Sequence, residues 1–554
     1  LHTPPGNGLA THGRTDGRLA RTSRTSHDAR NRIARPPNKV PWEAHPPGRY
    51  PDHTMFLETW RQHWGLKDAP FVHEDADKDP VLDRMESMAV HSSFDRLFGE
   101  PASPVPGVVF GEKGSGKSGL RLAMLRALQR HNTENLSSRA FVVQYIDFDP
   151  MLENLRRTEG IDASHKRAAE KVLDKLTRAD HLDAILGLAT TQITNELMLD
   201  RALGKKLDRR RRRDALHLAA LYHRSEDQTR EEAVNALRKQ LGGSSGLWLR
   251  RALLFTLTVL ALAVALAPHL GFLGAPFEGI EGESNGNWYM AGGALLAVTW
   301  MGAGIMKLML RVTAARATHS IRVTRGDSKV LAANLDASGR AARRELPLPQ
   351  SRGDEEVRYR LLRRLLGVLK GMGYTSLFVL VDRVDESALL AGDADAMQAF
   401  IEPLLQHKLL QLEDVALKMF LPIELSRLSL GARPDDLKRM RLDKANVVEE
   451  LRWSGQELLE IANQRIRASS TNAQAPRLSD FLASDLDEND LRNAFQELGT
   501  PRVCFGFLGA LLAEHARELP EDLDSEDSAW KIPRARFEVQ RAAWTDRARV
   551  LRRN

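Results

Sequence analysis

The segment that most restricts how this chain can fold is the stretch Gly-Glu-Lys-Gly-Ser-Gly-Lys-Ser at residues 111–118. It fits the pattern G-x-x-x-x-G-K-[ST] without a gap. An apolar run at 107–110 predicts a short buried strand before it, and residues 119–125 predict a helix after it. This order favours phosphate binding, because glycines let backbone N–H groups turn inward and the helix N-terminus adds positive partial charge. The sequence therefore predicts an α/β domain with a nucleotide site at this loop.

The loop residues have distinct expected roles in holding ATP and Mg²⁺. The backbone amides of 114–117 and the Lys117 amine are expected to hold the phosphates, and the Ser118 hydroxyl to ligate the metal. The alternative is an ordinary glycine-rich turn. The predicted binding residues are Gly111, Gly114, Ser115, Gly116, Lys117 and Ser118.

A second part of such a site follows the apolar run at residues 375–381, which predicts a buried strand. The run ends in Asp382, as in a Walker B motif, where the carboxylate at the C-terminal end of a strand reaches the Mg²⁺ shell. Ser118 and Asp382 are therefore predicted to share the metal. Asp385 and Glu386 are the candidates for orienting the attacking water, since a general base must lie within hydrogen-bond distance of it.

Two uncharged runs lie between the two motifs. Residues 252–277 contain no Asp, Glu, Lys or Arg, and neither do residues 288–306. Helices of about this length cross the hydrocarbon layer of about 30 Å, so we predict transmembrane helices at about 252–273 and 288–310. Acids occupy the connection (Glu278, Glu281 and Glu283) and basic residues flank the outer ends, which predicts a hairpin with both ends in the cytoplasm. The alternative is an apolar core hairpin of a soluble protein.

The remaining composition excludes some classes of site. Cys504 is the only cysteine, so a disulfide framework or a cysteine-rich metal site is excluded, which suits a reducing cytoplasm. The net charge of +7 is modest and much of it lies in residues 1–54, so it says little about nucleic acid. Five consecutive arginines at 209–213 are either a nucleic-acid patch or, as the apolar runs favour, a surface facing anionic lipid.

These features divide the chain into consecutive parts. Residues 1–54 are expected to be disordered and to be translated upstream sequence, with Met55 as the natural start. The parts that follow are 55–200, the N-terminal half of the P-loop domain with Walker A; 201–330, the helical membrane insertion; 331–450, the second half with Walker B; 451–520, a helical lid; and 521–554, a basic helical tail.

The predicted lid contains two helix starts. Ser454, with Glu457 three residues later, fits a capping box. Thr-Pro-Arg at 500–502 opens a second helix and resembles the second sensor of AAA+ and STAND ATPases, whose arginine touches the γ-phosphate. That resemblance gives Arg502 the sensor role, with a surface arginine as the alternative. A further candidate is Glu424, as a strand-end sensor. Arg439 or Arg441 is a candidate arginine finger, although a solvated basic face is the favoured interpretation of these two arginines.

The architecture resembles the KAP family of P-loop NTPases, in which a transmembrane hairpin is inserted between Walker A and Walker B. The resemblance covers roughly residues 60–515. It implies an ASCE-type α/β fold, with a mainly parallel sheet flanked by helices, the inserted helical region with two transmembrane helices, and the C-terminal helical lid. It also implies a multi-pass protein of the bacterial inner (cell) membrane with a cytoplasmic catalytic domain, in phage defence or signalling.

The Walker B segment departs from the family pattern, which usually runs Asp-Asp-hydrophobic-Asp-Arg. Here Arg383 replaces the acid beside the metal ligand. Asp385 or Glu386 would have to serve as the base, which favours a slow, switch-like ATPase. The predicted catalytic residues are Asp382, Asp385, Glu386 and Arg502.

The favoured interpretation is a membrane-anchored ATPase that acts as an ATP-dependent conformational switch. Its expected partners are ATP, the lipid bilayer, further copies of the chain in a homo-oligomer, and an unidentified protein. One alternative is a soluble AAA+-type motor acting on DNA or a secretion apparatus, suggested by the Gly-Leu…Pro-Phe segment at 65–71. Nucleic acid is a partner only in that case and is not favoured. The other alternative is an ATP-gated scaffold with little hydrolysis, suggested by Arg383.

Overall fold

Five parallel strands form one sheet in the computed structural model. In spatial order they are β2 (Arg139–Tyr145), β3 (Tyr374–Val381), β4 (Val415–Pro422), β1 (Gly107–Gly111) and β5 (Val447–Val448). Strands β1, β3 and β4 are apolar and almost wholly buried, as in parallel sheets covered by helices on both faces. The predicted α/β fold with a parallel sheet is confirmed. Strand β4 lies between β1, which precedes the glycine-rich loop, and β3, which precedes Asp382.

The structure describes most of the chain from His53 onward. The described residues are 53–73, 75–85, 91–162, 167–225, 228–242, 247–266, 284–405, 407–429, 446–472, 474–520 and 523–551. The expectation for the first 52 residues, the acidic connection at 277–283 and the arginine-finger candidates Arg439 and Arg441 lie outside the described residues.

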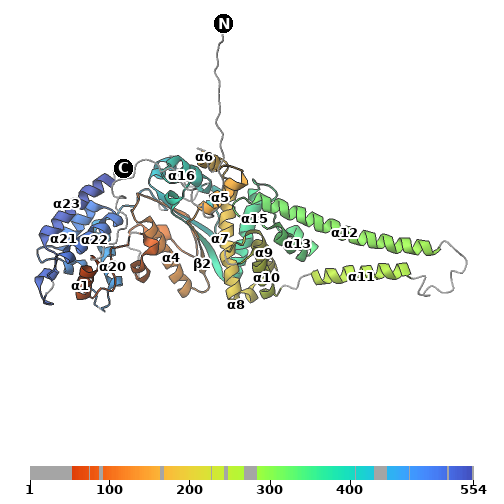
Figure 1. Ribbon diagram of the computed structural model, residues 1–554, viewed down its shortest axis with the longest axis horizontal. Coiled ribbons are helices and arrows are strands. Elements are labelled where there is room, and N and C mark those ends of the chain that lie inside the picture. Colours follow the sequence, from red (N-terminus) through yellow and green to blue (C-terminus); the bar gives the residue numbers. More distant parts are fainter. Residues whose placement is uncertain are drawn as a thin grey trace, which may run out of the picture. The chain divides into compact units, whose positions relative to one another are not determined.

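Alternate residues of the strands point into two hydrophobic cores, because successive side chains of a strand face opposite sides of the sheet. In β3, Leu377 and Val379 enter one core and Phe378 and Leu380 enter the other. Helices α7 (Arg178–Leu199) and α15 (Glu355–Met372) belong to the first core, and α4 (Lys117–Glu134) belongs to the second. Figure 1 shows α4 on one side of the sheet and α7 and α15 on the other.

The C-terminal helices complete the core that contains α4. They are α20 (Gly455–Ser469), α21 (Glu488–Leu498), α22 (Pro501–Arg517) and α23 (Arg534–Leu551). Helix α20 begins where the sequence predicts, because Ser454 and Glu457 form the expected capping box. The segment before β1 packs on these helices: α1 (His53–His63) contacts α22, and α2 (Pro80–Arg84) contacts α20. Next to α2 are η2 (Ala76–Lys78) and α3 (Phe94–Phe98).

The chain between β2 and β3 is helical and builds the other core. Its shorter helices are α5 (Asp149–Thr158), α6 (Ala168–Leu173), α8 (Arg201–Lys206), α9 (Arg209–Tyr222), α10 (Arg230–Gln240), α13 (Ser328–Ala337) and α14 (Arg340–Glu345). Helix α9 packs against both α7 and α15, and α13 packs against α9. The arginine run at 209–213 forms the first turn and a half of α9, beginning after the N-cap Asp208.

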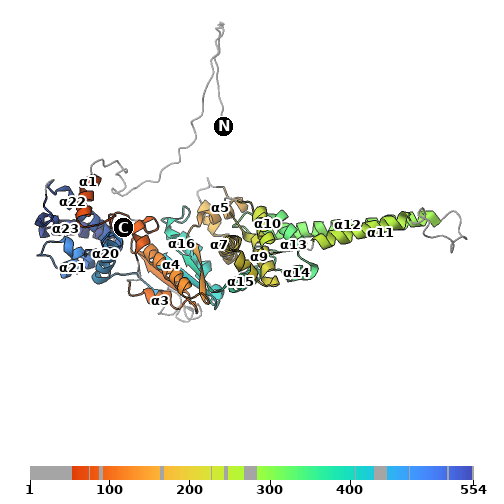
Figure 2. The ribbon, with the colours of Figure 1, turned by 90° about the horizontal axis from the view of Figure 1, so that it is seen from below.

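Two long helices of this region lie side by side as an antiparallel hairpin (Figures 1 and 2). They are α11 (Leu247–Leu266) and α12 (Ser284–Ser320). They approach closely at Gly292, where an added Cβ would lie 2.7 Å from the carbonyl oxygen of Ala261. Large apolar side chains are exposed on both helices, among them Phe255 at 71% and Trp300 at 62%.

One of the two helices meets the length and composition of a membrane span. Residues Met290–Ser320 of α12 are long and apolar enough, and their apolar stretch is not buried against other parts of the protein. The predicted first span, 252–273, is described only as far as Leu266, and its apolar helical part, Ala252–Leu266, is shorter than a span needs. Among the helices that the structure describes, α12 alone is therefore long and apolar enough to span a membrane.

A buried lysine in the central strand β4 has a strongly shifted pKa. Lys418 is almost fully buried, and its Nζ donates hydrogen bonds to the carbonyl oxygens of Leu97 and Phe98. Burial away from water disfavours the charged amine and lowers its pKa from 10.5 to about 7. The folded protein therefore releases this proton at a pH where the unfolded chain still holds it.

We predict that Lys418 makes the unfolding free energy rise with pH between about pH 7 and pH 10.5, because the unfolded state binds more protons in this window. Lys418→Met should remove a slope of at most about 1.4 kcal/mol per pH unit. Chemical unfolding of detergent-solubilised protein at pH 7.5 and pH 9 measures it. Lys370→Met, at a half-exposed lysine paired with Asp414, is the control and should leave the slope unchanged. An equal slope in wild type and Lys418→Met would contradict the prediction.

Candidate functional site

The glycine-rich loop connects β1 directly to α4. Strand β1 ends at Gly111, and α4 begins at Lys117. Gly114 and Gly116 have φ angles of 86° and 93°, in the left-handed region that a residue with a Cβ rarely adopts. The loop therefore curls at the N-terminus of α4 in a conformation that depends on its glycines.

Lys117 is folded back into this loop. It is buried, and its Nζ donates to the carbonyl oxygens of Gly111 at 2.8 Å and Glu112 at 3.0 Å. Burial lowers the pKa of the amine, and nearby carboxylates act in the opposite direction. The carboxylates that raise it are those of Asp385, Asp382 and Glu424. The amine of Lys117 therefore lies among the acids at the C-terminal ends of β3 and β4.

The structure brings Asp382 to the loop from the end of β3. The side chain is almost fully buried, and the nearby Ser118 hydroxyl acts to lower the pKa of its carboxyl group. The carboxylate accepts a hydrogen bond from Arg121 Nε at 2.9 Å. Burial raises the pKa of Asp382, and the charge of Arg121 together with this hydrogen bond opposes the rise. Ser118 and Asp382, predicted to share a metal ion, are thus neighbours in the structure.

Arg121 is a member of the site that the sequence analysis missed. It is fully buried, and besides Asp382 its guanidinium donates to Gln144 Oε1 at 2.5 Å and to both carboxylate oxygens of Asp77 at 2.5 and 2.6 Å. The one signal in the sequence was its spacing. Arg121 follows Lys117 by four residues, which places both on the same face of α4.

Arg383, the residue after Asp382, is paired with acids of the segment before β1. Its φ of 64° makes it the one non-glycine residue with positive φ in the part of the chain that the structure describes, a conformation that costs about 1 kcal/mol. The guanidinium is hydrogen-bonded to Asp75 at 3.1 Å and to Asp77. Asp77 of η2, which precedes the sheet, therefore pairs with two arginines, Arg121 of α4 and Arg383 after β3.

The two candidate water-orienting acids lie in one turn, η3 (Val384–Glu386), but have different neighbours. Asp385 is the foremost of the carboxylates that act on the Lys117 amine. Glu386 lies 3.5 Å from the Arg383 guanidinium, and burial is the main cause that raises its pKa. Of the two, Asp385 is the acid associated with the loop.

The start of α22 lies against the loop. The backbone N–H of Arg502 donates to the carbonyl oxygen of Gly114 at 3.3 Å, and a Cβ added at Gly114 would lie 2.9 Å from the Arg502 Cβ. Trp453, just before α20, donates from its indole Nε1 to the carbonyl oxygen of Ser115 at 2.6 Å. The residue before α20 and the start of α22 thus both contact the loop backbone. Arg502, the predicted sensor, lies beside the loop.

The loop also contains an unsatisfied polar atom. The Ser115 side chain is almost fully buried, and its Oγ has no hydrogen-bond partner among the described residues. Leaving a buried hydroxyl without a partner costs about 1–3 kcal/mol. The orphaned hydroxyl, the left-handed glycines and the Ser118–Asp382 pair all fit a phosphate group with its metal ion.

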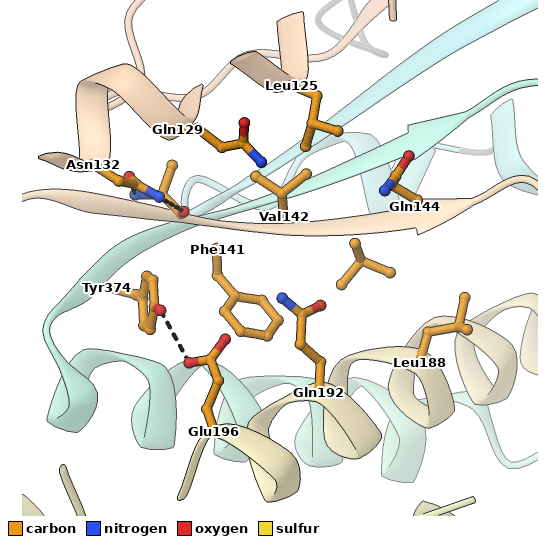
Figure 3. A pocket seen from close by; sticks show the side chains of 12 residues that line it. Leu125, Gln129, Asn132, Phe141, Val142, Gln144, Leu188, Gln192, Glu196 and Tyr374 are labelled. Atoms are coloured by element: carbon orange, nitrogen blue, oxygen red, sulfur yellow. Dashed lines mark hydrogen bonds between the residues drawn. The ribbon is translucent and has the colours of Figure 1, made fainter. Parts of the chain in front are cut away.

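A hollow of about 530 Å³ lies elsewhere, along the outer edge of β2 between α4 and α7 (Figure 3). Gln129 projects into it from α4 and Gln192 from α7. The side-chain amide of Asn132 accepts a hydrogen bond from the Ala140 N–H at 2.7 Å and donates one to the Ala140 carbonyl oxygen at 2.8 Å. It thus pairs with β2 as the backbone of a neighbouring strand would. None of the residues predicted for the nucleotide site lines this hollow.

No family model, curated protein or solved structure matches the chain. A function must therefore be inferred from the site itself. The residues of 111–118 lie together with Asp382, Asp385 and Arg502, whereas Glu386 is held by Arg383.

We predict that Arg121→Ala lowers the unfolding free energy by about 3–5 kcal/mol, because it leaves the buried carboxylate of Asp382 without its charged partner. Adding Asp382→Asn should recover part of the loss, since a neutral amide costs less to bury. Chemical unfolding measures both variants. The control is Arg126→Ala on the same helix, whose partner Asp83 is 84% exposed, and it should cost less than about 1 kcal/mol. Equal losses in Arg121→Ala and Arg126→Ala would contradict the prediction.

Proposed function

We propose that the chain is a membrane-anchored P-loop ATPase that uses ATP binding and hydrolysis as a conformational switch. The observation that carries the proposal is that Asp382 lies at the start of α4, beside Ser118 and bonded to Arg121 at 2.9 Å, next to a loop with left-handed glycines. A hydroxyl after the loop lysine and a strand-end carboxylate are the protein ligands of Mg²⁺ in P-loop NTPases. The position of β4 between β1 and β3 supports the ASCE-type fold and the resemblance to the KAP family.

In this proposal Ser118 and Asp382 hold Mg²⁺, and the backbone amides of 114–117 with the Lys117 amine hold the phosphates of ATP. The described residues contain no group of three or more His, Cys, Asp or Glu suited to a metal, so the phosphates would supply further ligands, as Mg²⁺ usually requires. Bound Mg²⁺ neutralises charge on the phosphates. Asp385 orients the attacking water, and Arg502 senses the γ-phosphate.

Nucleotide binding would change contacts that the structure contains. Lys117 must leave the carbonyl oxygens of Gly111 and Glu112 to reach phosphates. Arg502 must shift from its position over Gly114, because that is where phosphate oxygens would approach the loop. Since Arg502 opens α22, its movement would be passed to the lid, which is the proposed switch.

The segment before β1 offers a second route to the lid. Asp77 holds Arg121 and Arg383 at the candidate site, and two residues later Asp79 pairs with the buried Arg465 of α20 at 2.5 Å. Mg²⁺ at Asp382 would compete with Arg121 for the same carboxylate. A change in the Arg121–Asp77 pair would therefore act on α20 through a short, ordered connection.

The second candidate function is an ATP-gated scaffold with little hydrolysis. It is favoured by Arg383, which occupies the position after Asp382 and donates hydrogen bonds to Asp75 and Asp77. No acid is then available at that position to activate water. ATP binding with undetectable hydrolysis in a single-turnover experiment would select this function over the switch that hydrolyses ATP.

The membrane part of the proposal places α11 and α12 in a bacterial inner membrane, with the sheet on the cytoplasmic side. It is supported by the exposed apolar side chains of both helices, which would be costly in water. We also propose a homo-oligomer, since arginines from a neighbouring copy commonly complete such sites. An unidentified protein partner and a context in phage defence or signalling complete the proposal.

We predict that Lys117→Ala abolishes ATP binding, whereas Asp382→Asn retains binding and lowers kcat by at least about 100-fold, because only the second change acts on the metal. A fluorescence titration and a phosphate-release assay measure the two effects. Lys113→Ala, at an exposed lysine of the same loop with no assigned role, is the control and should change neither by more than about threefold. Wild-type ATP affinity in Lys117→Ala would refute the assignment of the loop.

We predict that Trp300→Arg greatly reduces the amount of protein in carbonate-washed membranes, because an arginine at the centre of a lipid-facing helix costs about 2.5–3.5 kcal/mol on insertion. Leu136→Arg replaces an exposed residue, at 74% against 62% for Trp300, in the loop between α4 and β2 and should have no effect. Wild-type protein recovered in a high-salt soluble extract would instead favour the soluble motor.

A further inference from the structure

A second hollow, of about 390 Å³, lies where α12 ends. One wall comes from α5 and the other from the end of α12 and the segment that follows it. None of the residues lining the hollow is acidic, and four are basic: Arg157, His319, Arg322 and Arg325. An open basic site at the end of a potential membrane span favours an anionic ligand.

Two of the four basic side chains are already neutralised by carboxylates outside the lining. Arg322 pairs with Asp180 at 2.5 Å and with Glu159 at 3.0 Å. Arg157 pairs with Glu153 at 2.6 Å. These two arginines are therefore fixed in position and contribute little net charge.

Arg325 supplies the surplus charge. It is exposed and forms no ion pair with any residue that the structure describes. The acid nearest to it in sequence, Asp327, is committed to the N-terminus of α13, where it accepts from the backbone N–H groups of Lys329 and Val330. A ligand with a negative charge would be the partner that this guanidinium lacks.

The hollow also offers a free hydroxyl. The Oγ1 of Thr324 is buried and has no hydrogen-bond partner within the described part of the chain. Asn154 fixes the backbone beside it by donating to the carbonyl oxygen of Val323 at 3.1 Å. An anion with oxygen acceptors, such as a phosphate group, would satisfy this hydroxyl and Arg325 together.

The position along α12 matches the surface of a bilayer. The last large apolar residue exposed on the helix is Val312, and His319 lies seven residues further, or about 10 Å at 1.5 Å per residue. The polar headgroup layer is about 5–8 Å thick on each side of the hydrocarbon core. The exposed charges of Lys307 and Arg311 precede Val312, so the hydrocarbon ends before Val312 and the hollow lies just beyond the headgroups.

We propose that this hollow binds a phosphate group through Arg325 and Thr324, and that its source is either the headgroup of an anionic phospholipid or a soluble phosphate compound. The lipid source rests on the membrane insertion proposed above, whereas phosphate recognition does not. Arg322 links the site to Asp180 on α7, and α7 packs against β2. A ligand bound here would therefore lie beside the Arg322–Asp180 ion pair, which joins the segment after α12 to α7.

The test uses the full-length protein in a neutral detergent and titrates dioctanoyl phosphatidylglycerol, dioctanoyl phosphatidylcholine and inorganic phosphate. Arg325→Ala should weaken phosphatidylglycerol binding about fivefold, the effect of one charge near a membrane surface. Thr324→Val should weaken it by a similar factor, and Arg325→Lys should bind more tightly than Arg325→Ala. The control is Arg316→Ala, an exposed arginine of α12 that does not line the hollow, with a change below twofold.

The outcomes separate the sources. Preference for phosphatidylglycerol without competition from millimolar inorganic phosphate supports the lipid headgroup, and competition supports a soluble phosphate compound. Equal binding of the two lipids, or equal loss in Arg325→Ala and Arg316→Ala, would overturn the site. Lys117→Ala should retain wild-type lipid binding, so loss of ATP binding alone leaves this site intact. Loss of lipid discrimination with intact ATP binding would contradict this inference and leave the proposed ATPase function standing.

Discussion

The buried carboxylate of Asp382 lies where three distant parts of the chain meet. It ends β3, lies beside Ser118 and is bonded to Arg121 at the start of α4, and through Arg121 is joined to Asp77 of the segment before β1. Taking a carboxylate out of water is costly. Arg121 offsets that cost only when it is itself held in good geometry by its other partners. These three parts must therefore fold together, and the candidate site is formed at their junction.

The parallel sheet explains how a large helical region can be inserted without disturbing this junction. Strands β2 and β3 pair side by side, although the chain between them builds most of one core and the α11–α12 hairpin. Buried ion pairs hold the helices of that region to one another. Arg358 of α15 pairs with Asp183 of α7 at 2.9 Å, both fully buried, and Tyr222 donates to the same carboxylate. Such pairs fix how helices pack more than they add stability.

The C-terminal helices and the segment before β1 act as one cover over the loop. Trp453 and Arg502 contact the loop backbone, while the Arg465–Asp79 pair joins α20 to the segment that carries Asp77. A ligand at the loop would thus meet groups that also hold the lid. In the proposed function, these shared contacts are what would convert phosphate binding into a rearrangement of helices.

The amino-acid sequence by itself determined the features that depend on local pattern. The glycine-rich loop with its strand and helix, Asp382 after an apolar strand, the capping box at Ser454 and the apolar length of α12 are all set by residues close together in the chain. The tertiary structure alone decided the partners of the buried charges. Arg121, Asp77 and Arg465 carry no motif, and Arg383 could have faced the loop. Their roles come from contacts between segments that only the assembled cores bring within hydrogen-bond distance, because desolvation forces each buried charge to find a partner.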